Sequence, residues 1–159
     1  MRGLKQSGGS LSEAMRARSR VIPCLALIVT VVACGGSGEP ACVAQLPRAS
    51  QGECNLQYMP TFDRIYLETL GSGSCGTVEG LMCHSPNASA GGLILAADEN
   101  TAFRSLLQGG RVIPFDPECS PLMRRLESGK ADFQMPPGGQ LSPQVRCAIV
   151  EWIANGAPR

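Results

Sequence analysis

The spacing of apolar residues along the chain predicts four short helices and no sustained strand. Apolar positions recur three and four residues apart, which places them on one face of a helix. The expected helices cover residues 61–70, 99–108, 121–128 and 143–155. The last helix has the clearest stripe, which consists of Val145, Ile149, Trp152 and Ile153. The pattern therefore predicts a mostly α fold.

Capping residues mark the ends of these helices. A Ser, Thr or Asp precedes each expected first turn, and a glycine follows three of the four last turns. The expected N-caps are Thr61, Asp98, Ser120 and Ser142, and the expected stops are Gly71, Gly109 and Gly156. Long connections rich in glycine and proline separate the helices, since the 159 residues include 19 Gly and 12 Pro.

Composition indicates a modest hydrophobic core. Aromatic residues make up only 4% of the chain, and its length allows one small domain. A small core usually needs cross-links or a bound cofactor to be stable. We therefore expect the fold to rely on one or both.

The N-terminal segment has the layout of a bacterial secretory signal. Residues 21–33 form a short apolar run that follows three arginines, and the run is too short for an ordinary membrane span. The residues before Cys34 fit the lipobox, so we expect cleavage there and a lipid on the Cys34 thiol. A flexible tether at 35–38 follows. A start at Met15, which would leave residues 1–14 outside the protein, stays open.

These features predict a lipid-anchored protein of the bacterial cell envelope that faces the periplasm. Gly35 is not the aspartate that commonly retains lipoproteins at the inner membrane, which favours the outer membrane. A retained membrane anchor, or a signal peptide cut elsewhere, remains the alternative. From Cys34 onward the chain has nine Lys/Arg and twelve Asp/Glu, a net charge of −3, so nothing indicates nucleic-acid binding.

Six cysteines remain after processing, and an even number in an oxidising compartment indicates disulfides. They are Cys42, Cys54, Cys75, Cys83, Cys119 and Cys147. Six cysteines allow 15 pairings. Proximity favours Cys42–Cys54, and Cys119–Cys147 could join two predicted helices. Cys75 and Cys83 then remain, beside the single histidine of the chain, His84.

Two motifs stand at fixed places in this helical plan. Cys75 to His84 follows the first predicted helix, and Met135-Pro136-Pro137-Gly138 precedes the last. With these motifs the sequence resembles the class I c-type cytochromes, most closely the planctomycete and myxobacterial periplasmic domains. The resemblance covers about residues 58–158. It also rests on Pro60-Thr61-Phe62, Ile65-Tyr66, Gly91-Gly92-Leu93, residues 114–125, and Trp152-Ile153 with Gly156-Ala157.

The resemblance implies one covalently bound haem c. Cys75 and Cys83 would form the thioether bonds, His84 would be the proximal iron ligand, and Met135 the distal one. Such a centre passes single electrons to a redox protein partner and leaves no iron position open for catalysis, so no enzyme activity is expected. The first and last helices would pack beside the haem, with Phe62 and Trp152 as candidate wall residues.

The spacing of the cysteines leaves a second interpretation open. Seven residues separate Cys75 from Cys83, whereas the usual attachment motif has two. The alternative is a haem-free, disulfide-stapled binding or structural module of the envelope, in which Cys75 and Cys83 form a bridge. In both interpretations we expect a signal at 1–33, a tether and cross-linked loop at 34–57, and a cytochrome c-like domain at 58–159.

Overall fold

The computed structural model describes residues 41–71, 75 and 83–159. The chain divides into two compact units, 1–36 and 37–159, and the first lies wholly outside the described residues. The predicted signal and Cys34, the predicted site of lipidation, therefore also lie outside them. Within the described residues, no helix is long and apolar enough to cross a membrane.

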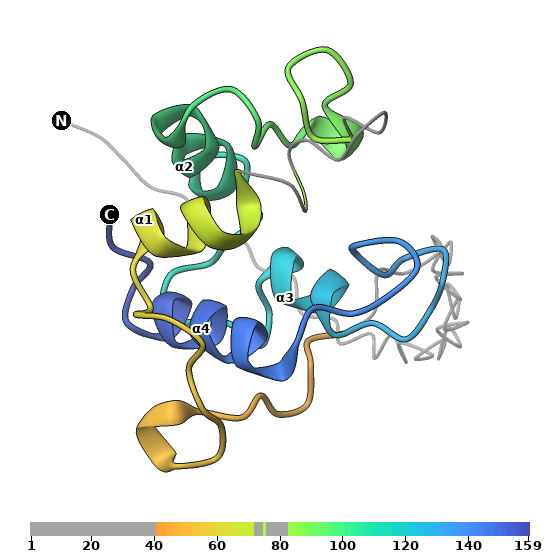
Figure 1. Cartoon of the computed structure of the whole chain (residues 1–159). Coiled ribbons are helices and arrows are strands. Elements are labelled where there is room, and N and C mark those ends of the chain that lie inside the picture. The colour runs from red at the N-terminus through yellow and green to blue at the C-terminus, as the bar shows by residue number, and fades with distance from the viewer. Residues whose placement is uncertain (1–40, 72–74, 76–82) are drawn as a thin grey trace, which may run out of the picture. The chain divides into compact units, whose positions relative to one another are not determined.

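The described part of the chain is helical and has no strand, which confirms the predicted fold class. Its α-helices are α1 (Phe62–Ile65), α2 (Glu99–Leu107), α3 (Pro121–Leu126) and α4 (Pro143–Ala154) (Figure 1). A π-helical segment, η2 (Tyr66–Leu70), continues α1 directly, so the two together span the first predicted helix. Single 3-10 turns lie at η1 (Ala49–Gln51) and η3 (Ala90–Gly92).

Two of the four predicted N-caps form the expected hydrogen bonds. Asp98 accepts one from the Thr101 backbone N–H at 2.9 Å, and Ser142 accepts one from that of Val145 at 3.3 Å. Thr61 makes no side-chain cap bond. Ser120 also occupies its predicted N-cap position, before α3, without a side-chain cap bond. Its buried hydroxyl bonds the preceding loop instead, accepting from the Ile113 N–H and donating to the Asp116 carbonyl, both at 2.8 Å.

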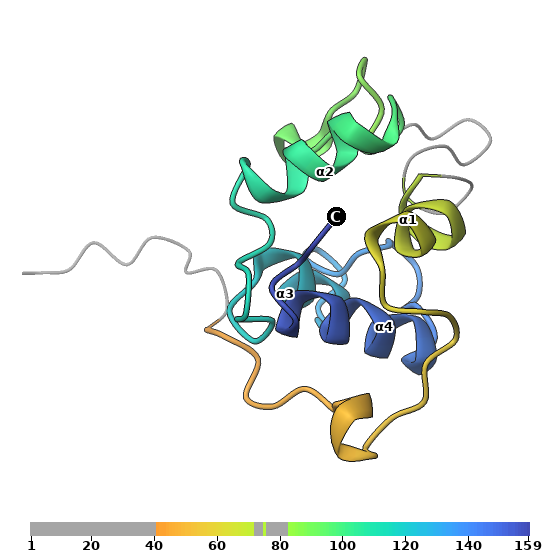
Figure 2. The same ribbon diagram turned by 90° about the vertical axis from the view of Figure 1, so that its left-hand side faces the viewer.

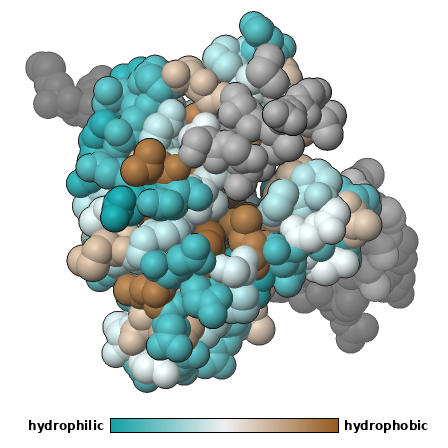
Figure 3. All heavy atoms as spheres, in the orientation of Figure 1, coloured by the Kyte–Doolittle hydropathy of each residue, from teal (hydrophilic) through white to brown (hydrophobic). Residues whose placement is uncertain are grey.

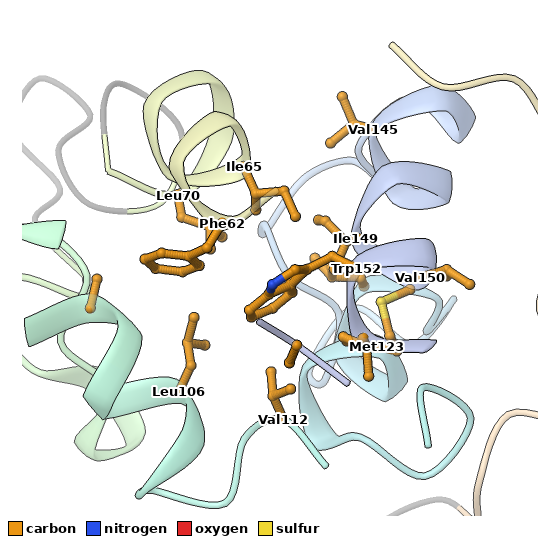
Figure 4. Close-up of a cluster of buried hydrophobic side chains, with 14 of the residues drawn as sticks. Phe62, Ile65, Leu70, Leu106, Val112, Met123, Val145, Ile149, Val150 and Trp152 are labelled. Carbon is orange, nitrogen blue, oxygen red and sulfur yellow. The ribbon is translucent and has the colours of Figure 1, made fainter. Parts of the chain in front are cut away.

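The core lies where α1, α2 and α4 meet, and α3 adds Met123 to it (Figure 4). Phe62 and Trp152 are fully buried, with ring centroids 5.4 Å apart. Phe103 meets Phe62 edge-on at 4.9 Å, an arrangement that aromatic quadrupoles favour. Although the chain has few aromatic residues, these three pack together in a single cluster of the core.

An N-terminal strap, residues 41–58, runs past α4 to α1 (orange to yellow in Figures 1 and 2). The Val43 N–H donates to the Glu118 carbonyl at 2.9 Å, and Arg48 pairs with the Glu118 carboxylate at 2.8 Å. The buried Glu151 of α4 accepts from the backbone N–H and hydroxyl of Ser50, each at 3.1 Å. The strap is thus attached to the helical body along its length.

The disulfides correct the predicted pairing. The structure joins Cys42 to Cys119 and Cys54 to Cys147, not Cys42 to Cys54 and Cys119 to Cys147. The bridges span 77 and 93 residues of sequence. The physical reason is the path of the strap, which lies against the segment before α3 and against α4, so distant cysteines become neighbours.

Apolar side chains also reach the surface. Figure 3 shows one face, on which apolar residues form small separate patches among polar ones. The large apolar side chains that are exposed in the described residues are Leu56, Met59, Leu67, Ile113 and Phe115. Scattered exposure of this kind is ordinary in soluble domains, so the site is better sought in a cavity.

Candidate functional site

A cavity of about 260 Å³ brings together three of the four residues predicted to hold a cofactor. His84, Met135 and Cys75 all contribute to its wall. The rest of the described lining consists of Leu70, Ala90, Gly91, Leu93, Leu95, Arg111, Pro121, Leu122, Arg125 and Leu126. Most of these side chains are apolar, as is usual in ligand pockets, where a few polar groups fix the orientation of the ligand.

Main-chain hydrogen bonds position His84. Its carbonyl accepts from the Leu95 N–H at 2.7 Å, and the carbonyl of the preceding Cys83 accepts from the Ala90 N–H at 2.7 Å. The buried Ser85 starts the turn between these points, because its carbonyl accepts from the Ser89 N–H at 2.8 Å. The loop after His84 therefore folds back on itself and fixes the histidine at the cavity.

The surroundings of His84 favour the neutral imidazole. Burial lowers its pKa, and the positive charges of Arg125 and Arg111 lower it further. The carbonyls of Leu93 and Ala90 act in the opposite direction but do not reverse the shift. The Nδ1 atom is buried and makes no hydrogen bond of good geometry within the described residues. A neutral imidazole has a free lone pair, which is the form that binds a metal.

Met135 is tied to α3 by its own backbone. Its N–H donates to the Arg125 carbonyl at 3.0 Å. The Arg125 guanidinium lies over the Phe133 ring, 4.2 Å from its centroid, and donates to the Phe133 carbonyl at 3.3 Å. Helix α3 therefore holds the start of the Met-Pro loop, and the loop presents Met135 to the cavity.

The two cysteines next to the histidine differ in position. Cys75 is half-buried at the cavity, and burial raises the pKa of its thiol to about 11. Cys83 is exposed and does not appear in the cavity lining. Both thiols are free, so the bridge expected of a haem-free form is not made here. Residues 76–82, which connect them, lie outside the described residues.

Two aromatic residues that were expected in the wall of the cavity do not lie there. Phe62 and Trp152 were candidate wall residues, but the cavity lining does not include them. They pack against each other in the core instead, because α1 and α4 are in direct contact. Leucines of η2, α3 and the loop before α2 take the wall positions, among them Leu70, Leu93 and Leu126.

Sequence reasoning gave no role to the two arginines of the cavity, Arg111 and Arg125. One signal could have pointed to Arg111. No Asp or Glu occurs from residue 100 to residue 115, so this arginine has no acidic neighbour in sequence. No comparable pattern marks Arg125.

The donor set fits a haem better than a bare metal ion. The described residues contain no group of three His, Cys, Asp or Glu side chains that could hold an ion. A haem iron needs only two protein ligands, and an imidazole and a thioether face one apolar cavity here. Cys75 adds a thiol at the same wall. The structure thus brings His84, Met135 and Cys75 together, and it leaves Cys83 at the surface beside them.

The described residues form a small helical domain with a mostly apolar cavity. Comparison with known families narrows the class: residues 81–139 match the family described as Planctomycete cytochrome C. The match supports a cytochrome c-like domain of the planctomycete type, as the sequence motifs predicted. It includes Cys83, His84 and Met135 and begins after Cys75. Neither a curated protein nor a solved structure matches the chain.

Proposed function

We propose that the protein is a one-electron carrier with a single covalently bound haem c. One observation carries the proposal: His84 and Met135, 51 positions apart in sequence, line the same cavity. Both lie in the segment that matches the cytochrome family. Carriage of electrons, rather than catalysis, is the function proposed, because an iron held by both His84 and Met135 would have no position open for a substrate.

The residues of the cavity have distinct roles in this proposal. His84 and Met135 would bind the haem iron, and Cys75 and Cys83 would form the thioether attachments. The haem, when bound, supplies an iron that cycles between two oxidation states. Burial favours the neutral His84 imidazole, which is the form that binds iron, and leucines make much of the cavity wall apolar. A dry pocket and a methionine ligand both tune the reduction potential, methionine by raising it.

The proposed setting is the bacterial envelope. Cys34 would hold a lipid, so that the domain faces the periplasm from a membrane, with the outer membrane favoured over the inner. The two long-range disulfides support an oxidising compartment, because such bridges are rare in reduced ones. A redox protein would be the partner for electron exchange.

A haem measurement tests the proposal directly. The chain should be produced together with a cytochrome c maturation system and purified oxidised. We expect a Soret band, and haem that stays on the chain after denaturation. Colourless protein from cells that mature a control cytochrome would overturn the proposal.

Two ligand variants sharpen this test. His84→Ala should abolish haem retention, because the iron loses its proximal ligand. Met135→Leu should retain the covalent haem but lower the reduction potential, measured by redox titration. Met59→Leu is the matched control, since Met59 is 67% exposed and should change neither property. Equal potentials for Met135→Leu and the parent protein would remove Met135 from the ligand set.

One observation favours the second candidate function, a haem-free module of the envelope. The Cys83 thiol is exposed and is not part of the cavity wall. In this case the cavity would bind another apolar ligand or none. Cys75 and Cys83 are then both detectable by mass spectrometry after reduction and alkylation, whereas thioether bonds to haem would block both.

A further inference from the structure

The charged side chains in the described lining of the cavity are both positive. Arg111 and Arg125 both belong to its lining, and no aspartate or glutamate does so among the described residues. A ligand that fits must therefore combine a large apolar body with negative charge.

Neither guanidinium is neutralised within the described part of the chain. Arg111 donates to the carbonyls of Gly91 and Gly109. Arg125 donates to the Phe133 carbonyl and stacks on its ring. These contacts orient the arginines but add no opposite charge. A guanidinium has five N–H donors, so each arginine keeps donors for a ligand.

We propose that Arg111 and Arg125 bind the two carboxylates of the haem. The inference rests on the proposed function and adds to it the residues that recognise the polar edge of the porphyrin. A guanidinium binds a carboxylate through two parallel hydrogen bonds, which fixes orientation as well as adding affinity. The two carboxylates match the two arginines in number and charge. The leucine wall then takes the apolar part of the ring.

The test uses the haem-free chain with both disulfides formed. Ferric haemin and haemin dimethyl ester, in which both carboxylates are masked, are titrated separately and followed by the Soret band. We expect Arg111→Gln and Arg125→Gln each to weaken haemin binding about tenfold, in line with charge-assisted hydrogen bonds at a partly exposed site. Binding of the dimethyl ester should be unchanged, because the ester offers no charge to the arginines.

Control variants distinguish binding of the haem carboxylates by the arginines from a purely structural role of these side chains. Arg64→Gln is the matched control, since Arg64 is an exposed arginine of α1 outside the cavity. If Arg111 serves only to hold Gly91 and Gly109, its loss should weaken haemin and its ester equally, and this result would overturn the inference. Arg111→Lys, which keeps the charge but loses the fork, should fall between the parent and the glutamine variant.

The outcome also distinguishes this inference from the proposed function. If the parent chain binds no haemin and matures without haem, the proposed function fails. If the parent chain binds haemin and both arginine variants bind it equally well, only the inference on the arginines fails.

Discussion

Cys75 and Cys83 are separated by seven residues, yet their thiols have different surroundings. Cys75 is half-buried at the cavity, where its pKa is raised to about 11, and Cys83 is exposed. The thiolate is the reactive form, so burial and protonation both protect Cys75. The difference concerns the haem-free chain only, because haem attachment would consume both thiols.

We expect Cys83 to be alkylated well before Cys75 in the haem-free chain. With a pKa of about 11, roughly one Cys75 thiol in a thousand is ionised at pH 8. Time-resolved labelling with iodoacetamide and peptide mass spectrometry would measure both rates. Equal rates in the folded chain would contradict the assigned positions. In urea the two rates should converge, which serves as the control.

At the scale of the elements, the end of α4 shows a well-defined stop. The Ala157 N–H donates to the Trp152 carbonyl and the Gly156 N–H to that of Ile153, both at 2.9 Å. This is the Schellman pattern, in which the residue after the C-cap takes a left-handed conformation. Gly156 meets that need with a φ of 92°. Sequence alone predicted this glycine, because the motif is local.

Replacing Gly156 with alanine should destabilise the protein by about 1–2 kcal/mol. The positive φ disfavours any side chain, and a Cβ would lie 2.5 Å from the Phe115 ring. Urea unfolding of the oxidised chain gives the difference. Gly129→Ala is the matched control, since a Cβ there meets nothing within 4 Å and the backbone shows no positive φ. A neutral Gly156→Ala variant would show that the helix end relaxes freely.

At the scale of the whole molecule, the strap and its two bridges compensate for a small core. Cys42–Cys119 and Cys54–Cys147 close long loops of sequence, so they restrict the unfolded chain strongly in the chain-entropy description. They also attach the strap to the segment before α3 and to α4. The strap is therefore fixed to the helical body by covalent bonds as well as by hydrogen bonds.

Removing Cys42–Cys119 by substituting both cysteines with alanine should cost about 2–5 kcal/mol of unfolding free energy. Neither residue is buried, so little packing is lost with the bridge. Denaturant unfolding measures the change, and Cys83→Ala, which removes an exposed free thiol, is the control. A non-reducing peptide map should show Cys42 linked to Cys119. Finding Cys42 linked to Cys54 would contradict the structure.

Local patterns carried most of the fold prediction. The four helices form within a few residues of their predicted ends, because apolar spacing and caps act over one or two turns. Ser120 shows where a local pattern fails to predict a side-chain contact. Ser120 has the residue type of a cap, but its hydroxyl satisfies a buried loop instead, and no sequence pattern shows which of these two partners a serine takes.

The sequence by itself determined the helices, the motifs at His84 and Met135, and the cytochrome-like class, since each is encoded in residues that are close in sequence. Only the tertiary structure decided which cysteines pair and that two arginines line the cavity. It also decided that Phe62 and Trp152 lie in the core and not in the cavity wall. Each of these depends on how distant segments meet, and that follows from the packing of the whole chain, which no local pattern contains.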